Sequence, residues 1–309
     1  MSTLLITHPA SMNHLNSPGH PERPDRLRAI QSVLEAEQFQ TLVRVQAPAA
    51  DLETIALCHP IDYIEAIRDA TPKEGLIQLD ADTSMSPGSF EAALRAVSGA
   101  VHAVDQVVTK KADNAFCAMR PPGHHAETAR PMGFCIFNQA AIAARYAQKQ
   151  HGLGRVAVVD FDVHHGNGTQ EIFWSDPTLM YCSTHEMPLY PGTGAVAETG
   201  KHDNIVNAPL RAGDGGDKFR AAMEQRILPR LLAFGPDLIV ISAGFDAHMR
   251  DPLANLQLNE ADFGWATREI MAIADTTAQG RVVSVLEGGY DLEGLSRSAA
   301  AHVIALMRG

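Results

Sequence analysis

The chain has 309 residues, of which 45% are hydrophobic and 20% charged, a composition typical of a globular protein. Its formal net charge is -11 and the sequence holds no basic cluster, so we expect no nucleic-acid partner. The polar N-terminal segment has neither a basic region nor a long apolar stretch, so we expect no signal peptide and no membrane span.

Short apolar runs alternate along the chain with segments of helical periodicity. In chain order, we predict a strand at Leu4–Thr7, helices at Pro24–Glu37 and Phe90–Val108, a strand at Ala115–Met119, a helix at Gln139–Gln150, strands at Val156–Phe161 and Leu179–Ser183, a helix at Lys218–Ala233, a strand at Leu238–Ser242, a helix at Glu260–Ala274, a strand at Val282–Leu286 and a helix at Leu292–Met307. Such apolar strands are typical of a parallel sheet covered on both faces by helices. We therefore predict an α/β fold and, because no Ser/Gly-rich linker divides the chain, a single domain over residues 1–309.

Several of the predicted strands run directly into reactive polar side chains. The segments that follow these strands are Arg120–His125, Asp160–Thr169, Ala243–His248 and Glu287–Tyr290. In open α/β sheets, the carboxyl ends of the strands form the edge at which ligands bind. Charged groups are rarely buried without partners, because removing them from water is costly. The pattern therefore predicts one active or metal-binding site at this edge.

Within these segments, Asp162 and His164 lie two positions apart, so on an extended backbone they project to the same side. Asp246, after another strand, is the natural third ligand. Two carboxylates and an imidazole with open coordination positions suit catalytic Zn²⁺, although Fe²⁺ and Mn²⁺ also accept such ligands. The alternative is a solvated polar strand end, with Asp246 as a helix cap or turn residue.

His124 and His125 follow a turn stiffened by two prolines, and one histidine could accept a proton while the other donates one. Tyr290 follows two glycines, and its phenol could donate a hydrogen bond to a developing oxyanion. The loops that carry Phe134 and Tyr190 could form aromatic walls around a long aliphatic side chain. Ordinary packing, with one histidine in the core and one exposed, is the alternative for each of these residues.

Taken together, these motifs resemble the zinc-dependent histone deacetylase family, in its bacterial class II-like branch. The resembling segments follow the family order over nearly the whole chain and comprise His20–Pro24, Arg120–His125, Gly133–Phe134, Asp160–Thr169, Pro191–Gly194, Ala243–Asp246 and Glu287–Tyr290. The resemblance implies an arginase/deacetylase-like fold with a central eight-stranded parallel sheet. It also implies hydrolysis of an N-acetyl amide, typically on a lysine side chain, to acetate and a free amine.

The resemblance assigns roles to individual residues of this sequence. It implies zinc ligands at Asp162, His164 and Asp246, a catalytic pair at His124 and His125, orienting partners at Asp160 and Asn167, and an oxyanion-stabilising phenol at Tyr290. It implies substrate contacts at Gly133, Phe134, Tyr190, Leu253 and Gly288, and an internal channel lined by Arg26. It implies a structural potassium site at Asp160, Asp162, His164, Ser183 and Thr184, and a second, weaker one at Phe173, Asp176, Leu179 and Asn204. His165 is left as structural support.

Three positions depart from class I members of the family. Asn167 stands where those members have an aspartate, Tyr190 where many relatives have a phenylalanine wall, and Leu253 where class I enzymes often have methionine. An amide orients an imidazole without adding negative charge. We therefore expect His124, paired with Asp160, to have the higher pKa, and His125 to be neutral and available as a base.

Several alternatives stay open at this point. An acetylated polyamine or another small acetylamide could replace acetyl-lysine as substrate, and a binuclear manganese ureohydrolase or a non-catalytic acyl-lysine binding protein would share the fold. A homo-oligomer is also left open. The four cysteines form no CxxC pair, and we expect free, buried thiols in a reducing compartment, hence a cytoplasmic protein.

Overall fold

The computed structural model describes residues 2–49 and 51–308 and shows a central sheet between two layers of helices. All neighbouring strands of this eight-stranded sheet are parallel, in the order β2-β1-β5-β10-β9-β6-β7-β8. Its strands are β1 (Thr3–Thr7), β2 (Val43–Gln46), β5 (Asn114–Cys117), β6 (Val156–Asp160), β7 (Leu179–Glu186), β8 (Ile205–Leu210), β9 (Leu238–Ala243) and β10 (Val282–Leu286). A small antiparallel pair, β3 (Ile77–Gln78) and β4 (Ser84–Met85), lies apart from it. The predicted α/β class and eight-stranded parallel sheet are confirmed.

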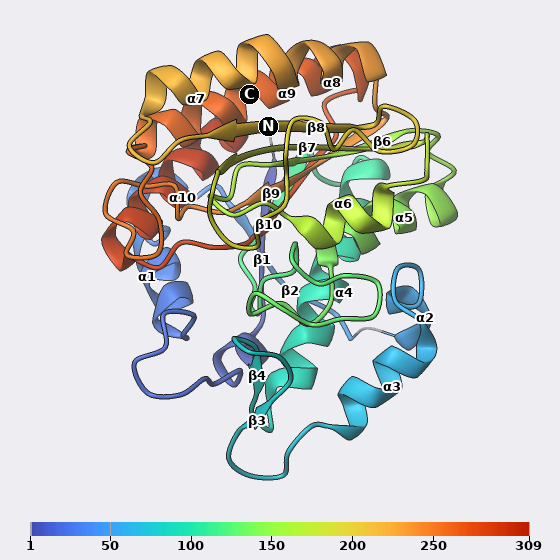
Figure 1. Cartoon of the computed structure of the whole chain (residues 1–309), viewed down its shortest axis with the longest axis vertical. Coiled ribbons are helices and arrows are strands. Elements are labelled where there is room, and N and C mark those ends of the chain that lie inside the picture. The colour runs from blue at the N-terminus through green and yellow to red at the C-terminus, as the bar shows by residue number, and fades with distance from the viewer. Residues whose placement is uncertain (1, 50, 309) are drawn as a thin grey trace.

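Helices cover both faces of the sheet, with α7, α8 and α9 along one side and α4 and α5 on the other (Figure 1). The helical elements are η1 (Pro9–Met12), α1 (Asp25–Val33), η2 (Glu37–Phe39), α2 (Leu52–Ile55), α3 (Ile61–Asp69), α4 (Ser89–Val108), α5 (Gln139–His151), α6 (Asn167–Phe173), α7 (Gly216–Ala222), η3 (Met223–Ile227), α8 (Leu228–Phe234), α9 (Glu260–Thr277) and α10 (Leu292–Arg308). Helix α9 begins at a capping box in which Asn259 and Asp262 satisfy each other's backbone N–H groups.

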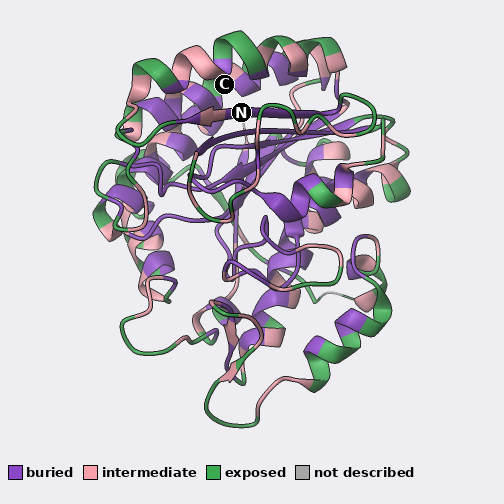
Figure 2. Cartoon of the chain, in the orientation of Figure 1, coloured by how far each residue is buried: buried purple, intermediate pink, exposed green. Residues whose placement is uncertain are grey.

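Successive side chains of each strand enter different cores. On β6, Ala157 and Val159 belong to the hydrophobic cluster that includes Ile270 of α9, whereas Val156 and Val158 belong to the cluster that includes Ile142 of α5. This arrangement explains why the central strands have continuous apolar runs such as Val156–Val159, since both of their faces are covered. Figure 2 shows the consequence, with strands buried along their length and exposed residues on the outer sides of the helices. The four cysteines are free and buried, as expected.

The elements that the sequence pattern missed are short or lie at the sheet edges. Strand β2 is largely exposed and alternates apolar with polar residues, and β8 carries Asn207 and Pro209, so neither has the continuous apolar run used to predict strands. Helices α2, α3 and α6 were also missed. The single helix predicted at Lys218–Ala233 is divided by a π-helical turn, η3. Within the described residues, no helix has the length and apolarity needed to cross a bilayer.

The strand order explains why the reactive segments come together. The four strands that precede them, β5, β10, β9 and β6, are consecutive neighbours in the middle of the sheet. Because all four are parallel, their carboxyl ends lie side by side at one edge. Segments that are more than 100 residues apart in the sequence therefore meet there.

A buried ionic cluster fastens the N-terminal segment to this edge. The carboxylate of Glu22 accepts hydrogen bonds from Arg120 and Arg26, and all three side chains are fully buried. Arg26 in turn donates to the carbonyl oxygens of Glu287 (2.5 Å) and Gly289 (2.6 Å). Burial alone would raise the pKa of Glu22, but Arg120 beside it holds this pKa well below the usual range.

We expect Glu22→Gln to destabilise the fold by about 3–5 kcal/mol, because it leaves two buried guanidinium groups without their carboxylate. Since the folded-state pKa of Glu22 is depressed, its contribution is present above an unfolded-state pKa of about 4.3 and is lost as the pH falls. Urea-induced unfolding at neutral pH measures the loss. Glu35→Gln, on an exposed glutamate, is the control and should change stability by less than about 0.5 kcal/mol. Equal stability of both variants would contradict the assigned role.

Candidate active site

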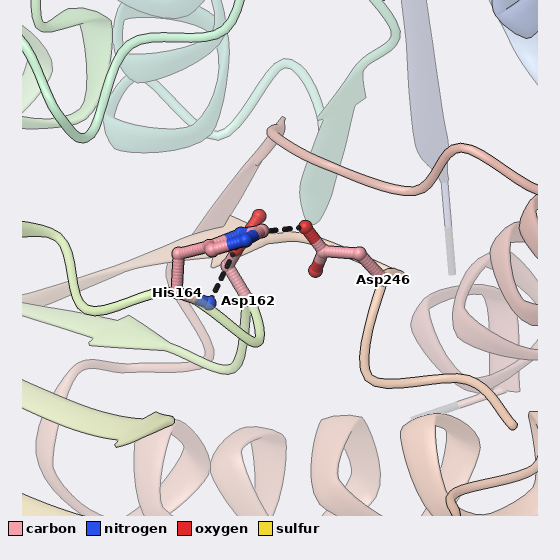
Figure 3. A group of neighbouring side chains, drawn as sticks. All are labelled: Asp162, His164 and Asp246. Atoms are coloured by element: carbon pink, nitrogen blue, oxygen red, sulfur yellow. Dashed lines mark hydrogen bonds and ion pairs between the residues drawn. The ribbon is translucent and has the colours of Figure 1, made fainter. Parts of the chain in front are cut away.

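Asp162, His164 and Asp246 form a compact group of possible metal ligands. Their donor atoms all lie within 4.8 Å of one another, and the three residues are buried. Figure 3 shows the three side chains grouped together. The Nδ1 atom of His164 lies 3.2 Å from Asp162 Oδ1 and 3.1 Å from Asp246 Oδ2. The group consists of two carboxylates and one imidazole. Ligands of these types at this spacing fit a divalent transition-metal ion.

The main chain around the triad holds its carboxylates in place. Gly288 N–H donates to Asp162 Oδ2 at 2.8 Å, and Val163 N–H donates to Asp246 Oδ1 at 2.9 Å. A Cβ atom at Gly288 would stand 2.1 Å from Asp246 Oδ2, and one at Gly244 would stand 2.0 Å from Asp162 Oδ2. Both positions therefore require glycine for close approach of the backbone to the carboxylates.

The electrostatics of the triad favour a cation. Burial opposes a positive charge on His164, yet the hydrogen bonds and charges of Asp162 and Asp246 raise the pKa of His164 to about 10. Burial also raises the pKa of Asp246, and the Asp162 charge adds to this effect. A site that holds a proton so firmly offers the same stabilisation to a metal ion.

His124 is held by a buried carboxylate. Its Nδ1 atom is 2.9 Å from Asp160 Oδ2, which also accepts the Tyr181 hydroxyl at 2.9 Å. The main-chain N–H of His124 donates to Glu287 Oε2 at 3.2 Å, and the N–H of Gly123 donates to the same atom at 2.7 Å. The ring and the backbone of His124 are therefore fixed by two different carboxylates.

His125 is held by an amide instead. Its Nδ1 atom is 2.8 Å from Asn167 Oδ1, at the first residue of α6. Its ring centroid is 4.0 Å from that of His124 and 5.9 Å from that of His164, so the histidine pair lies against the triad. The partners predicted for the two histidines, Asp160 and Asn167, are thus the ones that the structure places beside them.

The two histidines have pKa values in the predicted order. Burial lowers the pKa of both rings, but for His124 the charges of Asp162, Asp160 and Glu287 outweigh burial and raise the pKa well above its usual value. For His125, burial and the positive charges of His124 and His164 lower the pKa well below its usual value. The largest cause for His125 is burial, and its partner Asn167 adds no negative charge that would oppose it.

A pocket of about 220 Å³ reaches His164 of the triad and His125 of the histidine pair. The residues that line it are Asp82, His125, Gly133, Phe134, His164, Leu189, Tyr190, Leu253 and Tyr290. Gly133 (φ +56°) is pressed against the His125 ring, where a Cβ atom would approach within 2.3 Å. Most of the predicted substrate contacts line this pocket, whereas Gly288 instead packs beneath the triad carboxylates.

Tyr290 is set by contacts behind the pocket. Its N–H donates to Asp251 Oδ2 at 2.7 Å, and the guanidinium of Arg26 stacks 4.8 Å from its ring centroid. Burial raises the pKa of Tyr290 well above its usual value, so the phenol keeps its proton at neutral pH. Arg26 thus supports the tyrosine, and its predicted role in an internal channel stays a prediction.

The residues of the first predicted potassium site lie on neighbouring strand ends, since Asp160 of β6 pairs with Ser183 of β7. At the second predicted potassium site, the carbonyl oxygens surround a side-chain amide. The carbonyl oxygens of Phe173, Asp176 and Leu179 all accept from Asn204 Nδ2, at 2.9, 3.1 and 2.9 Å. The three carbonyl oxygens therefore converge on one point, which the amide nitrogen occupies, and the second potassium site stays a prediction.

Several residues at the site were missed in the sequence. Asp82 lines the pocket and accepts the N–H of Gly133 at 2.9 Å, and Glu127 accepts the Asn167 amide at 2.7 Å. Tyr181 supports Asp160, and Asp251 supports Tyr290. Glu127 and Asp251 are acids close to motif residues in the sequence, and that proximity was their one available signal, whereas Asp82 lies far from every motif and Tyr181 lies inside a strand.

Comparison with known proteins shows similarity along nearly the whole chain. The family model described as "Histone deacetylase domain" matches residues 20–306. The chain is 39% identical to a probable deacetylase of Archaeoglobus fulgidus, over all of this chain and 87% of that protein. It is 39% identical to the histone deacetylase-like amidohydrolase of Pseudomonas aeruginosa, over 88% of this chain and 73% of that protein. The crystal structure of the HDA15 HD domain superposes with a TM-score of 0.93 and 34% identity, covering 99% of this chain and 88% of that one.

We expect the purified chain to bind one Zn²⁺ ion tightly and Asp246→Asn to weaken binding by at least about a hundredfold, because one of three ligands loses its charge. Calorimetric titration of metal-stripped protein measures this loss. Asp251→Asn is the matched control, since it changes a buried carboxylate near the triad but outside it. Equal weakening by both substitutions would contradict the assignment of Asp246 as a ligand.

Proposed function

This chain belongs to the histone deacetylase family, and we propose that it is a zinc-dependent deacetylase that hydrolyses acetylated amines, with acetyl-lysine side chains as the preferred substrates. The family membership and the amidohydrolase class rest on the comparisons. The choice of zinc and of acetyl-lysine is our proposal. The observation that carries it is the convergence, at the base of one pocket, of a carboxylate–imidazole–carboxylate triad, a histidine pair and a tyrosine.

In this proposal, Asp162, His164 and Asp246 hold the metal. A bound zinc ion supplies Lewis-acid polarisation of the acetyl carbonyl and makes a water molecule more acidic. Because two of its three ligands would be anionic, the ion would be a weaker Lewis acid than one held by three histidines. The histidine pair and the tyrosine therefore have to supply more of the catalysis.

The two histidines divide the proton transfers between them. His125 is neutral because its pKa is lowered, and it lines the pocket, so it is the group that accepts the proton of the attacking water. His124 keeps its proton because its pKa is raised, and that charge stabilises the anionic tetrahedral intermediate nearby. A protonated histidine then donates to the nitrogen of the departing amine. Asp160 and Asn167 keep the two rings in position throughout.

Tyr290 would stabilise the oxyanion. It lines the pocket together with His125 and His164, and its raised pKa keeps the hydroxyl available as a donor. The Asp251 contact to its main chain holds the loop that presents it. A preorganised donor of this kind acts where charge develops in the transition state.

The pocket walls suit an aliphatic stem. Phe134, Leu189, Leu253 and the ring of Tyr190 provide apolar surface around the entrance. The Tyr190 ring meets the edge of His125 at 5.1 Å between centroids, so the wall continues to the base of the pocket. A four-carbon lysine stem that ends in an acetamide matches a pocket with apolar walls and a polar base.

We also propose one structural potassium ion at the strand ends that carry Asp160, Asp162, His164, Ser183 and Thr184. The support is the pairing of Asp160 with Ser183 and the burial of all five residues. The second, weaker potassium site at Phe173, Asp176, Leu179 and Asn204 also stays a proposal, which is supported by the convergence of three carbonyl oxygens on the Asn204 side chain.

A binuclear manganese ureohydrolase has less support. Within residues 2–49 and 51–308, Asp162, His164 and Asp246 form the one group of three or more acidic, histidine or cysteine ligands with metal-binding spacing. A second bridged metal would need further carboxylates beside them. A non-catalytic binding protein would not need the histidine pair and its two orienting partners.

We expect Tyr290→Phe to reduce kcat on an acetyl-lysine peptide by at least about 10²–10³, because it removes one oxyanion donor. Zinc binding should be unchanged, since the tyrosine is not one of the triad ligands. A discontinuous assay of acetate release measures the rate. Tyr63→Phe, which removes a buried hydroxyl bonded to Ile136, is the control. Full activity of Tyr290→Phe would contradict the proposed role of this tyrosine.

We expect the wild-type chain to prefer an acetyl-lysine peptide over acetylated spermidine by about tenfold or more in kcat/KM. A polyamine carries further ammonium groups, and the one carboxylate among the pocket-lining residues, Asp82, already accepts from Gly133 N–H and the Thr83 hydroxyl. Competition between the two substrates in one reaction measures the preference. The reverse order would replace acetyl-lysine with a small acetylamide.

A further inference from the structure

The partner of His125 is an amide, and an amide has two chemically different ends. Asn167 Oδ1 accepts a hydrogen bond, and Nδ2 can only donate. Rotation of the side-chain amide by half a turn exchanges the two ends with little change of shape. Something must therefore decide which end faces His125 Nδ1, since the two orientations select different tautomers of the imidazole.

Glu127 determines which way the Asn167 amide is oriented. Its Oε1 atom accepts from Asn167 Nδ2 at 2.7 Å, and an ionised carboxylate has no proton to donate. Turning the amide would bring Oδ1 against the carboxylate, oxygen to oxygen. The side chain of Glu127 therefore presents an acceptor to the amide, although its charge also acts on Arg130. The other contact of Nδ2, Met132 Sδ at 3.3 Å, is also with an acceptor.

The backbone that carries Glu127 is fixed. Its N–H donates to Arg130 O at 3.0 Å in a tight turn, and the next residue, Thr128, donates from its N–H to Glu171 on α6 at 2.7 Å. Asn167 is the first residue of the same helix. The loop that follows the histidine pair and the start of α6 are therefore held in one register, which keeps the carboxylate opposite the amide.

We propose that Glu127 is a positioning residue that locks the orientation of the Asn167 amide and, through it, the tautomer of His125. With Oδ1 facing the ring, His125 carries its proton on Nδ1 and leaves the Nε2 lone pair free. With the amide turned, Nδ2 would donate to Nδ1 and the proton would sit on Nε2. The kinetic consequence rests on the proposed function, in which His125 accepts a proton. The tautomer itself does not depend on it.

The same geometry explains why an amide and a glutamate occur together here. An aspartate at position 167 would need no lock, because both of its oxygens accept, but it would place a second carboxylate within about 2.7 Å of Glu127. Asn167 avoids that repulsion, and Glu127 removes the ambiguity that the amide introduces. The two residues form a matched pair. A variant in which both are substituted should therefore be less impaired than a variant in which only one is substituted.

The test uses the full-length, zinc-loaded chain and four variants: Glu127→Gln, Asn167→Asp, the double variant of these two, and Glu171→Gln. The last is a matched control, since Glu171 does not touch Asn167 and a glutamine oxygen at position 171 can still accept from Thr128, which keeps the loop in register. Nitrogen-15 NMR of the His125 ring reports the tautomer directly. Steady-state kinetics on an acetyl-lysine peptide gives kcat and KM.

In the wild type and in Glu171→Gln, the expected spectrum is that of the Nδ1–H tautomer. In Glu127→Gln, a mixture of tautomers should appear and kcat should fall by about tenfold with KM nearly unchanged, because a glutamine can also donate and so permits the turned amide. The double variant should recover both the single tautomer and most of kcat, because the glutamine amide can donate to the new aspartate.

A single Nδ1–H tautomer in Glu127→Gln would overturn the inference, as would a double variant more impaired than either single substitution. Failure of the proposed function is distinguishable from this. If the wild type released no acetate from any acetylated amine, the tautomer shift in Glu127→Gln would still decide whether Glu127 locks the amide.

Discussion

The structure depends on compensating buried negative charge at one edge of the sheet. Asp160, Asp162, Asp246 and Glu287 all lie fully buried at the ends of neighbouring central strands. Burial raises the pKa of Glu287 to about 7, and it raises the pKa of Asp160 as well, which shows how costly the charges are. Without partners, such a group of carboxylates would oppose folding.

The neighbouring chain supplies those partners in several forms. Main-chain N–H groups of Gly123, Val163 and Gly288 donate to the carboxylates, which explains why backbone rather than side chain approaches them. Imidazoles, led by His124, supply positive charge. A divalent ion at the triad would supply the rest. The same requirement that stabilises the edge therefore also provides its chemistry, because histidines placed to balance charge acquire unequal pKa values.

The amino-acid sequence contains much of this arrangement but not all of it. Central strands such as Val156–Asp160 were predictable because both of their faces are buried, and this leaves a continuous apolar run. The edge strand Val43–Gln46 was not, because one side is exposed and its pattern is mixed. The triad was predictable because it follows those central strands. Asp82 and Glu127 were not, because they lie on loops, where no periodicity indicates which way a side chain points.

The amide at position 167 was anticipated as a weaker electrostatic partner for His125, and the structure adds a second reason for its presence. Burial and the charges on His124 and His164 lower the pKa of His125, and the amide partner adds no negative charge that would oppose them. A further feature that disfavours an aspartate is Glu127, whose carboxylate is 2.7 Å from the amide nitrogen. The difference between aspartate and asparagine at this position thus follows in part from the residue behind it. In sites of this kind, the second layer of contacts can determine which tautomer a base presents, while burial and the first layer determine whether it is charged.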